Sequence, residues 1–580
     1  MSYFRQLVSG VTNPALLVVL SLSAPAAFAE MTVSGLSGDA KENVLLTLSL
    51  AKEKCDAPEW KIQGLFENAD QEIDQALRAL GYYHAAVKKT LVLDKPCWKA
   101  DFTVDAGPQV IVSDVNIVIN GAAKNDKQFQ RLLTRMPLKK GSPVNHAQYE
   151  SMKSRIESLA MESGYLKGRF TENKLLIDKQ NNTAQIKLEY ASGQRMVFGD
   201  VVVEQTILEP EFVKKYLSIK EGDFYSSEQL VETHNALSKS GYFDIIDIHP
   251  DIENIQQQRV PVTLKLSPKS RHHYAFGAGF DTDIGPLLSA AYIDRRLNRR
   301  GHFLNANLDL SPVLSTADVD YTIPLANPVN DFFSVGAGFK REDTDTYKSL
   351  SARLSGRLKH AFESGWKQTL FLDYTYEDFD TGATTGHSLL LVPGGNWLHS
   401  FTDNPLRPTK GHRVELEVKG SIKNPISYAS FIQGYFSGVW IHKLPLSGKF
   451  IGRGELGATL VDDFNNLPTT YRFYAGGINS VRGYAYKELG PKDSMGEVIG
   501  GQFLTTVSAE YEQAFLENWG VAAFVDSGNA FNSDSIKLKT GVGIGLRWYS
   551  PLGPLRVDFA VPLDESDSSF QIHFAAGARI

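Results

Sequence analysis

The residue whose type and setting most clearly suggest a chemical role is Arg482, which lies in the Gly-rich segment Val481-Arg482-Gly483-Tyr484. A guanidinium keeps its charge at any ordinary pH, so an enclosed Arg482 would need carboxylate partners. Two candidates follow, Glu510 and Asp526, each in a segment where polar and apolar residues alternate. Alternation along a strand allows both carboxylates to point to one interior, where they could pair with Arg482. The alternative is a basic residue in a solvated surface loop.

The sequence contains none of the short motifs that mark common enzyme sites. We find no Gly-x-Ser-x-Gly, no His-Glu-x-x-His, no phosphate-binding Gly-x-x-x-x-Gly-Lys and no calcium loop. The 13 histidines are scattered, and Cys-His metal spacing is absent. A net charge of -6 provides no basic field for nucleic acid. We therefore expect no enzyme, no metal, no cofactor and no nucleic-acid partner.

The elements that must position Arg482 are strands, because polar and apolar residues alternate from about Arg271 to Ile580. In Arg413–Lys419, for example, Val and Leu residues alternate with charged residues, so one face suits lipid and the other suits water. A transmembrane β-barrel shows this pattern, since its backbone groups are paired between strands. A soluble β-sandwich also alternates, but it rarely sustains the pattern over so many segments. We predict an antiparallel transmembrane barrel.

The N-terminus indicates export. Arg5 supplies a positive region, Leu16–Leu22 an apolar region and Ala27-Phe28-Ala29 a small-x-small cleavage site, which predicts a signal peptide at residues 1–29. The alternative, an N-terminal membrane anchor, is disfavoured because the apolar stretch is shorter than the roughly 20 residues of a spanning helix. The mature chain would begin at Glu30 and reside in the periplasm, the outer membrane or the medium.

Cysteine usage agrees with export. The two cysteines, Cys55 and Cys97, lie in the N-terminal part, where an oxidising compartment allows them to pair. Such a disulfide would stabilise the fold by about 4 kcal/mol in the chain-entropy model. Two buried free thiols are the alternative.

The first half of the chain contains an internal repeat. Three predicted helices end in Gly-Tyr, at Gly81-Tyr82, Gly164-Tyr165 and Gly241-Tyr242, roughly 80 residues apart. Glycine after the last helical residue relieves the left-handed strain of the cap. A second marker repeats in the same way: Ala106-Gly107 and Ser192-Gly193 each precede an Asp-Val pair by the same number of residues. The pattern predicts one small α+β domain per repeat.

These repeats resemble POTRA (polypeptide-transport-associated) domains, which precede the barrel in the BamA/TamA superfamily of outer-membrane insertases. Three of them would occupy residues 30–105, 106–191 and 192–268. Residues 269–580 would then form a barrel of about 16 strands, at about 10 residues per strand and about as many per connection. Three repeats plus such a barrel are similar to TamA-type proteins, the outer-membrane subunits of the translocation and assembly module. BamA-type proteins have five repeats, and two-partner-secretion transporters have two.

The resemblance implies roles for the loop and the barrel wall. In the superfamily this loop motif docks near a matching Phe-x-Asp-x-Gly strand, here Phe524, Asp526 and Gly528, which implies a docking role for Val481, Arg482, Gly483 and Tyr484. Some relatives have Arg where this chain has Glu512, so the second partnership, with Glu510, is left open by the sequence.

The seam between the first and last strands is the second predicted functional element. Gly277 and Gly279 fall on the inner face of the first strand, and Phe574 and Gly577 lie in the last. Glycine weakens a strand, and a weak joint exposes backbone groups that can template an incoming strand. The resemblance implies a lateral gate there. The alternative is that the glycines only relieve crowding. The terminal Ile580 departs from the Phe or Trp that ends many barrel proteins.

The resemblance also implies location, function and partners. It implies a Gram-negative outer membrane with periplasmic POTRA domains, and insertion, folding and secretion of autotransporters and other β-barrel proteins. The implied partners are a TamB-like periplasmic protein anchored in the inner membrane, unfolded outer-membrane protein clients and outer-membrane lipid. A phospholipid conduit and a two-partner-secretion pore are the alternatives, and the sequence does not decide between protein and lipid clients.

Overall fold

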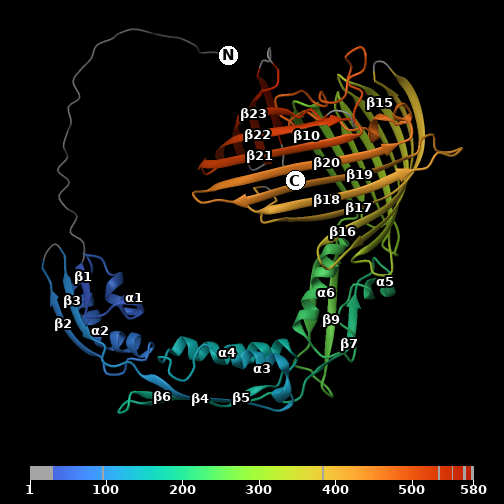
Figure 1. The fold of residues 1–580 in the computed structure, drawn as a ribbon. Helices are drawn as coiled ribbons and strands as arrows, with labels where there is room; N and C mark the ends of the chain where they lie inside the picture. The colour runs from blue at the N-terminus through green and yellow to red at the C-terminus, as the bar shows by residue number, and fades with distance from the viewer. Residues whose placement is uncertain are drawn as a thin grey trace, which may run out of the picture. The chain divides into compact units, whose positions relative to one another are not determined.

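The computed structural model describes residues 30–94, 97–381, 384–405, 407–532, 536–550, 553–565 and 570–576 (Figure 1). The predicted signal peptide therefore lies outside the described residues. The chain divides into two compact units. The first reaches Val197 and includes residues 222–227 and 255–260. The second holds most of the third small sheet and all of the barrel.

The first small domain packs two helices against a three-stranded sheet. Its elements are β1 (Glu30–Ser34), α1 (Gly38–Thr47), η1 (Ser49–Lys52), α2 (Glu59–Arg78), β2 (Ala86–Val92) and β3 (Lys99–Asp105). β3 lies centrally, parallel to β1 and antiparallel to β2. Val44, Leu77 and Phe102 lie in the buried core. Cys55 and Cys97 form a disulfide.

The second domain repeats this topology. Its elements are β4 (Ile111–Asn120), η2 (Ala122–Asn125), α3 (Lys127–Thr134), α4 (His146–Glu162), β5 (Arg169–Asp178) and β6 (Thr183–Ala191), in the sheet order β4-β6-β5. The side chains of Asp126 and Asn145 cap α3 and α4 by accepting backbone N–H groups. Phe129, Met152 and Ile156 anchor the helices on the sheet.

The third domain has the same arrangement, with the sheet order β7-β9-β8. Its elements are β7 (Val197–Glu204), α5 (Pro210–Lys214), α6 (Ser227–Ser240), β8 (Phe243–Pro250) and β9 (Arg259–Pro268). The three sheets agree with three α+β repeats, whereas the domain boundaries given above stay predictions.

The Gly-Tyr pairs end the helices as their sequence suggests. Gly81, Gly164 and Gly241 have φ values of 87°, 88° and 75°, which favour glycine. In the first two pairs the tyrosine N–H donates to the carbonyl five residues earlier, a Schellman cap. A Cβ at Gly81 would lie 2.6 Å from the carbonyl oxygen of Val144, so close packing also requires glycine there.

Sixteen antiparallel strands form a closed barrel in the described residues, which confirms the predicted fold class. Each strand pairs with its sequence neighbour, and β10 also pairs with β25. The strands are β10 (His272–Asp281), β11 (Gly285–Asp294), β12 (Phe303–Leu310), β13 (Leu314–Pro324), β14 (Asp331–Asp343), β15 (Lys348–Ala361), β16 (Trp366–Asp380), β17 (Thr385–Thr402), β18 (Gly411–Ser421), β19 (Phe431–Lys443), β20 (Gly448–Val461), β21 (Phe503–Leu516), β22 (Trp519–Phe531), β23 (Lys539–Ser550), β24 (Gly553–Pro562) and β25 (Gln571–Ala576).

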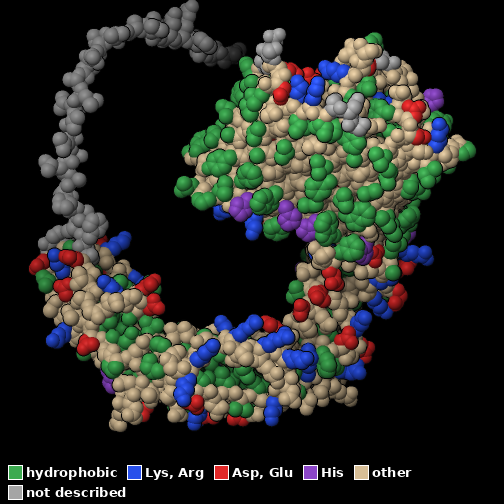
Figure 2. Space-filling view, in the orientation of Figure 1, with side chains coloured by type: hydrophobic (Ala, Val, Ile, Leu, Met, Phe, Trp, Pro, Cys, Tyr) green, Lys and Arg blue, Asp and Glu red, His purple; other side chains and the backbone are tan. Residues whose placement is uncertain are grey.

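The barrel turns apolar side chains outward and polar side chains inward. Along β14, Phe333, Val335 and Phe339 are exposed on the outer face, whereas Ser334 and Glu342 are buried. Figure 2 shows apolar side chains spread over the outer surface of the barrel. No helix among the described residues is long and apolar enough to span a membrane.

Candidate functional site: the lumen loop and the barrel seam

The connection between β20 and β21, residues 462–502, folds back into the barrel, and we call it the lumen loop. It contains two short helices, η3 (Phe464–Asn466) and η4 (Thr469–Tyr471). Val481 and Tyr484 are buried in an apolar cluster with Leu504 and Ala530 of the wall. The loop is thus a packed structure.

The lumen loop bridges opposite sides of the barrel. On one side, Lys487 Nζ lies 2.6 Å from Glu342 Oε1 of β14. On the other side, Arg482 is fully buried against β21, β22 and β24. Its Nε donates to Asp526 Oδ2 at 2.6 Å and its Nη2 to Asp526 Oδ1 at 2.9 Å. The Arg482 backbone N–H also donates to Asp526 Oδ2, at 3.1 Å.

Two further carboxylates complete the surroundings of Arg482. Its Nη1 donates to Glu510 Oε2 at 2.7 Å and to Asp558 Oδ2 at 3.2 Å. The guanidinium also lies on the Phe524 ring, 3.3 Å from its centroid. Asp526, Glu510 and Phe524 therefore all contact Arg482, and Asp558 is an additional partner.

The carboxylates are shared with other cations of the wall. Arg547 donates to Glu510 Oε1 at 2.7 Å and to Asp558 Oδ1 at 2.5 Å. Arg453 lies 3.6 Å from Glu510 Oε2. Arg547 Nε also lies 3.8 Å from Glu512 Oε2, and Glu512 pairs with Lys449. Three arginines, Arg453, Arg482 and Arg547, thus face the three carboxylates Glu510, Asp526 and Asp558. We call these six residues the ionic network.

Sequence reasoning missed Arg453, Arg547 and Asp558, although a signal for Asp558 existed. Asp558 has the period-two position of an inward residue on β24, and it lies opposite Gly545 in the β23–β24 register. A Cβ at Gly545 would overlap the Asp558 carboxylate, and one at Gly541 would overlap the carbonyl oxygen of Arg482. The inward glycines of β23 therefore form a trough that admits the loop backbone and the network.

The lumen loop also forms hydrogen bonds to both sides of the seam between β10 and β25. The Gly483 N–H donates to His573 Nε2 of β25 at 3.0 Å. The Ile478 N–H donates to Asp283 Oδ2, in the turn after β10, at 2.9 Å. Gly483 has a φ of 97°, which a residue with a Cβ rarely adopts. One loop therefore contacts the wall, the last strand and the first turn.

The seam itself is formed at the end of β10. Asp281 and Ala575 are registered partners, and the Thr282 N–H donates to the Phe574 carbonyl at 3.1 Å. The Phe574 ring lies 5.8 Å from that of Phe280. Within the described residues, Asp281 and Ala575 are the one registered pair between β10 and β25. By contrast, β10 pairs with β11 along its whole length.

The predicted glycines differ in their surroundings. Gly279 lines a cavity of about 730 Å³ beside the seam, which Arg453, Arg556 and Ala575 also line. A Cβ at Gly277 would meet only Ser289, at 3.6 Å, and a Cβ at Gly279 would meet nothing within 4 Å. By contrast, a Cβ at Gly528 would lie 2.6 Å from the Thr505 carbonyl oxygen. Gly577 and Ile580 lie outside the described residues.

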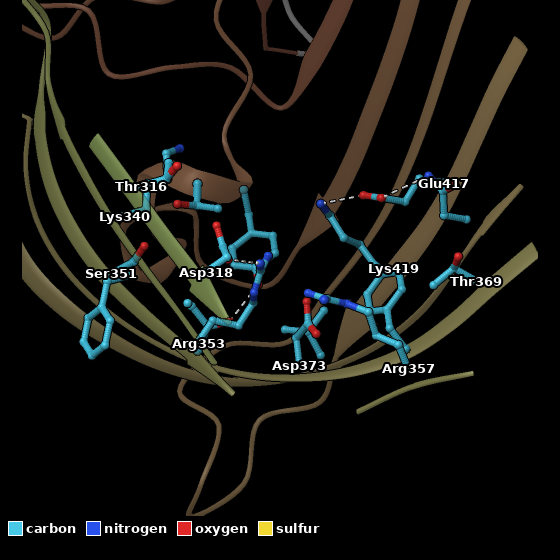
Figure 3. A pocket seen from close by; sticks show the side chains of 18 residues that line it. Thr316, Asp318, Lys340, Ser351, Arg353, Arg357, Thr369, Asp373, Glu417 and Lys419 are labelled. Carbon is cyan, nitrogen blue, oxygen red and sulfur yellow. Dashed lines mark hydrogen bonds and ion pairs between the residues drawn. The ribbon is translucent and has the colours of Figure 1, made fainter. Parts of the chain in front are cut away.

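A second lumen cavity, of about 460 Å³, is also lined by charged side chains, but its arginine pair is partly exposed, unlike the buried pairs of the ionic network. Figure 3 shows Arg353, Lys419 and Asp373 among its lining side chains, with the pairs Arg353–Asp318 and Lys419–Glu417 drawn as dashed lines. These pairs measure 3.2 and 2.8 Å, and Arg353 and Asp318 are 40% and 35% exposed. Among the described residues, no group of His, Cys, Asp or Glu side chains could hold a metal ion.

The fold and the site together define a class: a closed 16-stranded barrel preceded by POTRA-type domains, with an arginine-bearing loop folded into the lumen. Comparison with known families agrees. Residues 297–580 match the Omp85 superfamily domain, residues 30–106 match POTRA domain TamA domain 1, and residues 196–269 match a POTRA model described as surface antigen variable number repeat. The chain belongs to the Omp85 superfamily, with POTRA domains.

Its curated relatives include outer membrane protein assembly factors BamA. The protein of Nitratidesulfovibrio vulgaris is 27% identical over 376 residues, which cover 61% of this chain and 47% of that protein. The protein of Neisseria meningitidis is 22% identical over 502 residues, which cover 75% of this chain and 62% of that protein. The chain thus spans about half to three fifths of the length of these relatives.

A solved structure supports the fold. BamA from Haemophilus ducreyi lacking POTRA domains 1–3 matches with a TM-score of 0.67 at 18% identity, over 80% of this chain and 99% of that chain.

Proposed function

We propose that this protein promotes the insertion and folding of β-barrel proteins, including autotransporters and their secretion, through a lateral gate between β10 and β25. The observation that carries the proposal is the seam. In the described residues, β10 and β25 meet at Asp281–Ala575, and the lumen loop bonds to both sides through Ile478 and Gly483. The unpaired backbone groups of an opened seam would template a client strand.

The inner face of β10 supports the same proposal. A Cβ at Gly279 would touch nothing, so an inward side chain there has room and is not excluded by crowding. This weakens the alternative that the glycine only relieves steric pressure. Gly279 instead weakens the strand, because glycine makes no side-chain contacts and loses more backbone freedom on folding than other residues.

We further propose a TamA-type role. The match of residues 30–106 to the TamA first POTRA domain and the three small sheets support it. The proposal includes the outer membrane of a Gram-negative bacterium, periplasmic POTRA domains, the domain boundaries and signal peptide given above, and no enzyme activity. Its partners would be a TamB-like periplasmic protein, unfolded outer-membrane protein clients and outer-membrane lipid.

The ionic network favours an insertase over a secretion pore that empties its lumen. A pore would have to remove Arg482 from three carboxylates in a buried site, and breaking a buried pair costs about 3–5 kcal/mol. A lateral gate leaves these contacts in place. A lipid conduit with a periplasm-spanning partner is the second candidate, because the 730 Å³ cavity lies beside the seam.

The test is folding of an unfolded autotransporter barrel into liposomes that contain this protein, scored by protease protection. The locked variant is Asp281→Cys/Ala575→Cys, since registered antiparallel partners have a spacing that a disulfide can bridge. The matched control, Ala275→Cys/Ala291→Cys, links β10 to β11 and leaves the seam free.

We expect wild type and the control to accelerate client folding and the locked form to do so only after reduction. Wild type treated with the same reductant controls for the Cys55–Cys97 disulfide. Equal acceleration by the oxidised locked form would refute the gate. Lipid transfer without acceleration by any form would favour the conduit.

A further inference from the structure

The second POTRA domain carries an excess of positive charge on its helical side. Residues 124–169 contain ten Lys or Arg residues and four Asp or Glu residues, in a chain whose net charge is -6. Figure 2 shows Lys and Arg side chains gathered over the region that Figure 1 labels α3 and α4. The excess of positive charge is therefore confined to this part of the chain and is not a property of the whole protein.

A groove of about 520 Å³ lies between α3 and α4 and is lined by residues of these two helices and of the α3 C-cap. One face of α3 lines it with Gln128, Arg131 and Leu132, and Arg135, which caps the C-terminal end of α3, follows Arg131 by four residues. One face of α4 lines it with the same spacing, with Arg155 and Leu159 among its residues. Two leucines therefore form an apolar floor between three arginines.

Serine hydroxyls and one carboxylate complete the lining. Ser151, Ser154 and Ser158 lie on the same face of α4 as Arg155, so hydroxyl donors flank its guanidinium. Glu162, at the C-terminal end of α4, is the one carboxylate among the lining residues. The groove as a whole is cationic and rich in donors.

Arg131, Arg135 and Arg155 are exposed, and none of them forms an ion pair within the part of the chain that the structure describes. The ion pairs of the second domain, within the described residues, are Lys153–Glu150 and Lys174–Glu172, which use other cations. Arg131 and Arg135 lie at the C-terminal end of α3, where the helix dipole favours cations. Arg155 lies in the middle of α4, where the dipole offers no such benefit. Like charges held in one groove repel each other unless an anion neutralises them.

We propose that this groove binds the phosphate-bearing headgroup of an anionic phospholipid. Guanidinium forks and hydroxyls are donors suited to phosphate oxygens, and basic pockets recognise lipid headgroups. The volume falls in the range of small-ligand sites. Leu132 and Leu159 would lie under the glycerol and the first acyl carbons. A peptide made of acidic residues alone would pair with the arginines but offers no apolar side chain for these leucines.

The experiment is titration calorimetry on the full-length protein in a non-ionic amphipol, so that no free micelles compete for the probe. The probes are dioctanoyl phosphatidylglycerol, dioctanoyl phosphatidylcholine, glycerol phosphate and a hexaglutamate peptide. Dioctanoyl phosphatidylcholine reports any uptake by the barrel surface. The site variant is Arg131→Gln/Arg155→Gln. The matched control is Lys139→Gln/Lys140→Gln, which removes the same charge from exposed positions of the same domain that do not line the groove.

We expect the phosphatidylglycerol probe to bind and the phosphatidylcholine probe not to bind. The site variant should weaken binding about tenfold or more, because charge-assisted hydrogen bonds to phosphate are lost, and the control should change it less than about twofold. Equal losses in the two variants would show diffuse attraction and overturn the site. Glycerol phosphate binding as tightly as the lipid, or hexaglutamate displacing it, would overturn the lipid assignment. None of these readouts depends on client insertion.

Discussion

Replacing Arg482 with alanine should destabilise the barrel strongly. Arg482 and Asp526 are both 0% exposed and joined by two side-chain hydrogen bonds, so the variant leaves Asp526 buried without its cation. Removing one partner of a buried pair costs about 3–5 kcal/mol. Glu510 and Asp558 keep Arg547, so most of the loss belongs to Asp526.

The structure therefore predicts partial rescue. Adding Asp526→Asn to Arg482→Ala removes the uncompensated carboxylate while keeping its shape, and contacting residues show coupling of about 0.5–3 kcal/mol. The matched control is Arg353→Ala, whose single ion pair with Asp318 is more than a third exposed. That change should cost about 1 kcal/mol or less.

Equilibrium urea unfolding in phospholipid vesicles, followed by Trp fluorescence, measures all four proteins. Heat modifiability on SDS gels gives an independent reading of the folded barrel. The reasoning is refuted if Arg482→Ala loses no more stability than Arg353→Ala, or if Asp526→Asn adds to the loss instead of reducing it.

Three further predictions concern other parts of the chain. Gly541→Ala should lower barrel stability by about 1–3 kcal/mol, since its Cβ would overlap a loop carbonyl oxygen, whereas Gly434→Ala has open space and should be near neutral in the same urea assay. Cys55→Ser/Cys97→Ser should destabilise the first domain by up to about 4 kcal/mol, seen as earlier limited proteolysis in urea; an unchanged profile would contradict this. Burial lowers the pKa of His146 below its ordinary 6.5, so the unfolded chain binds more protons, and the second domain should lose stability as pH falls from 6.5 towards the folded pKa. Hydrogen exchange at two pH values, corrected for intrinsic rates, tests this; His146→Gln should remove the dependence, and its persistence in that variant would contradict the assignment.

The local features of this protein could be predicted from its sequence. The Gly-Tyr pairs at residues 81, 164 and 241 mark helix ends because a positive φ depends on one residue and its neighbours. The period-two pattern predicted the barrel because the side-chain direction alternates along every strand, and the length of residues 269–580 predicted about 16 strands. Arg482 could be singled out because a charge that cannot be discharged needs a counter-charge wherever it is enclosed.

The tertiary structure alone decided which groups meet. Asp558 lies 76 residues from Arg482 in sequence, and only barrel closure and strand register bring them together. The same holds for Gly483 and His573, and for Asp281 and Ala575 at the seam, since no local pattern encodes which residues of the first and last strands become partners. Sequence patterns predicted the strands, the helix ends and the need for an anion near Arg482. Closure of the barrel determined the three carboxylates that supply it and the loop that straps the seam, because those contacts depend on register summed over sixteen strands.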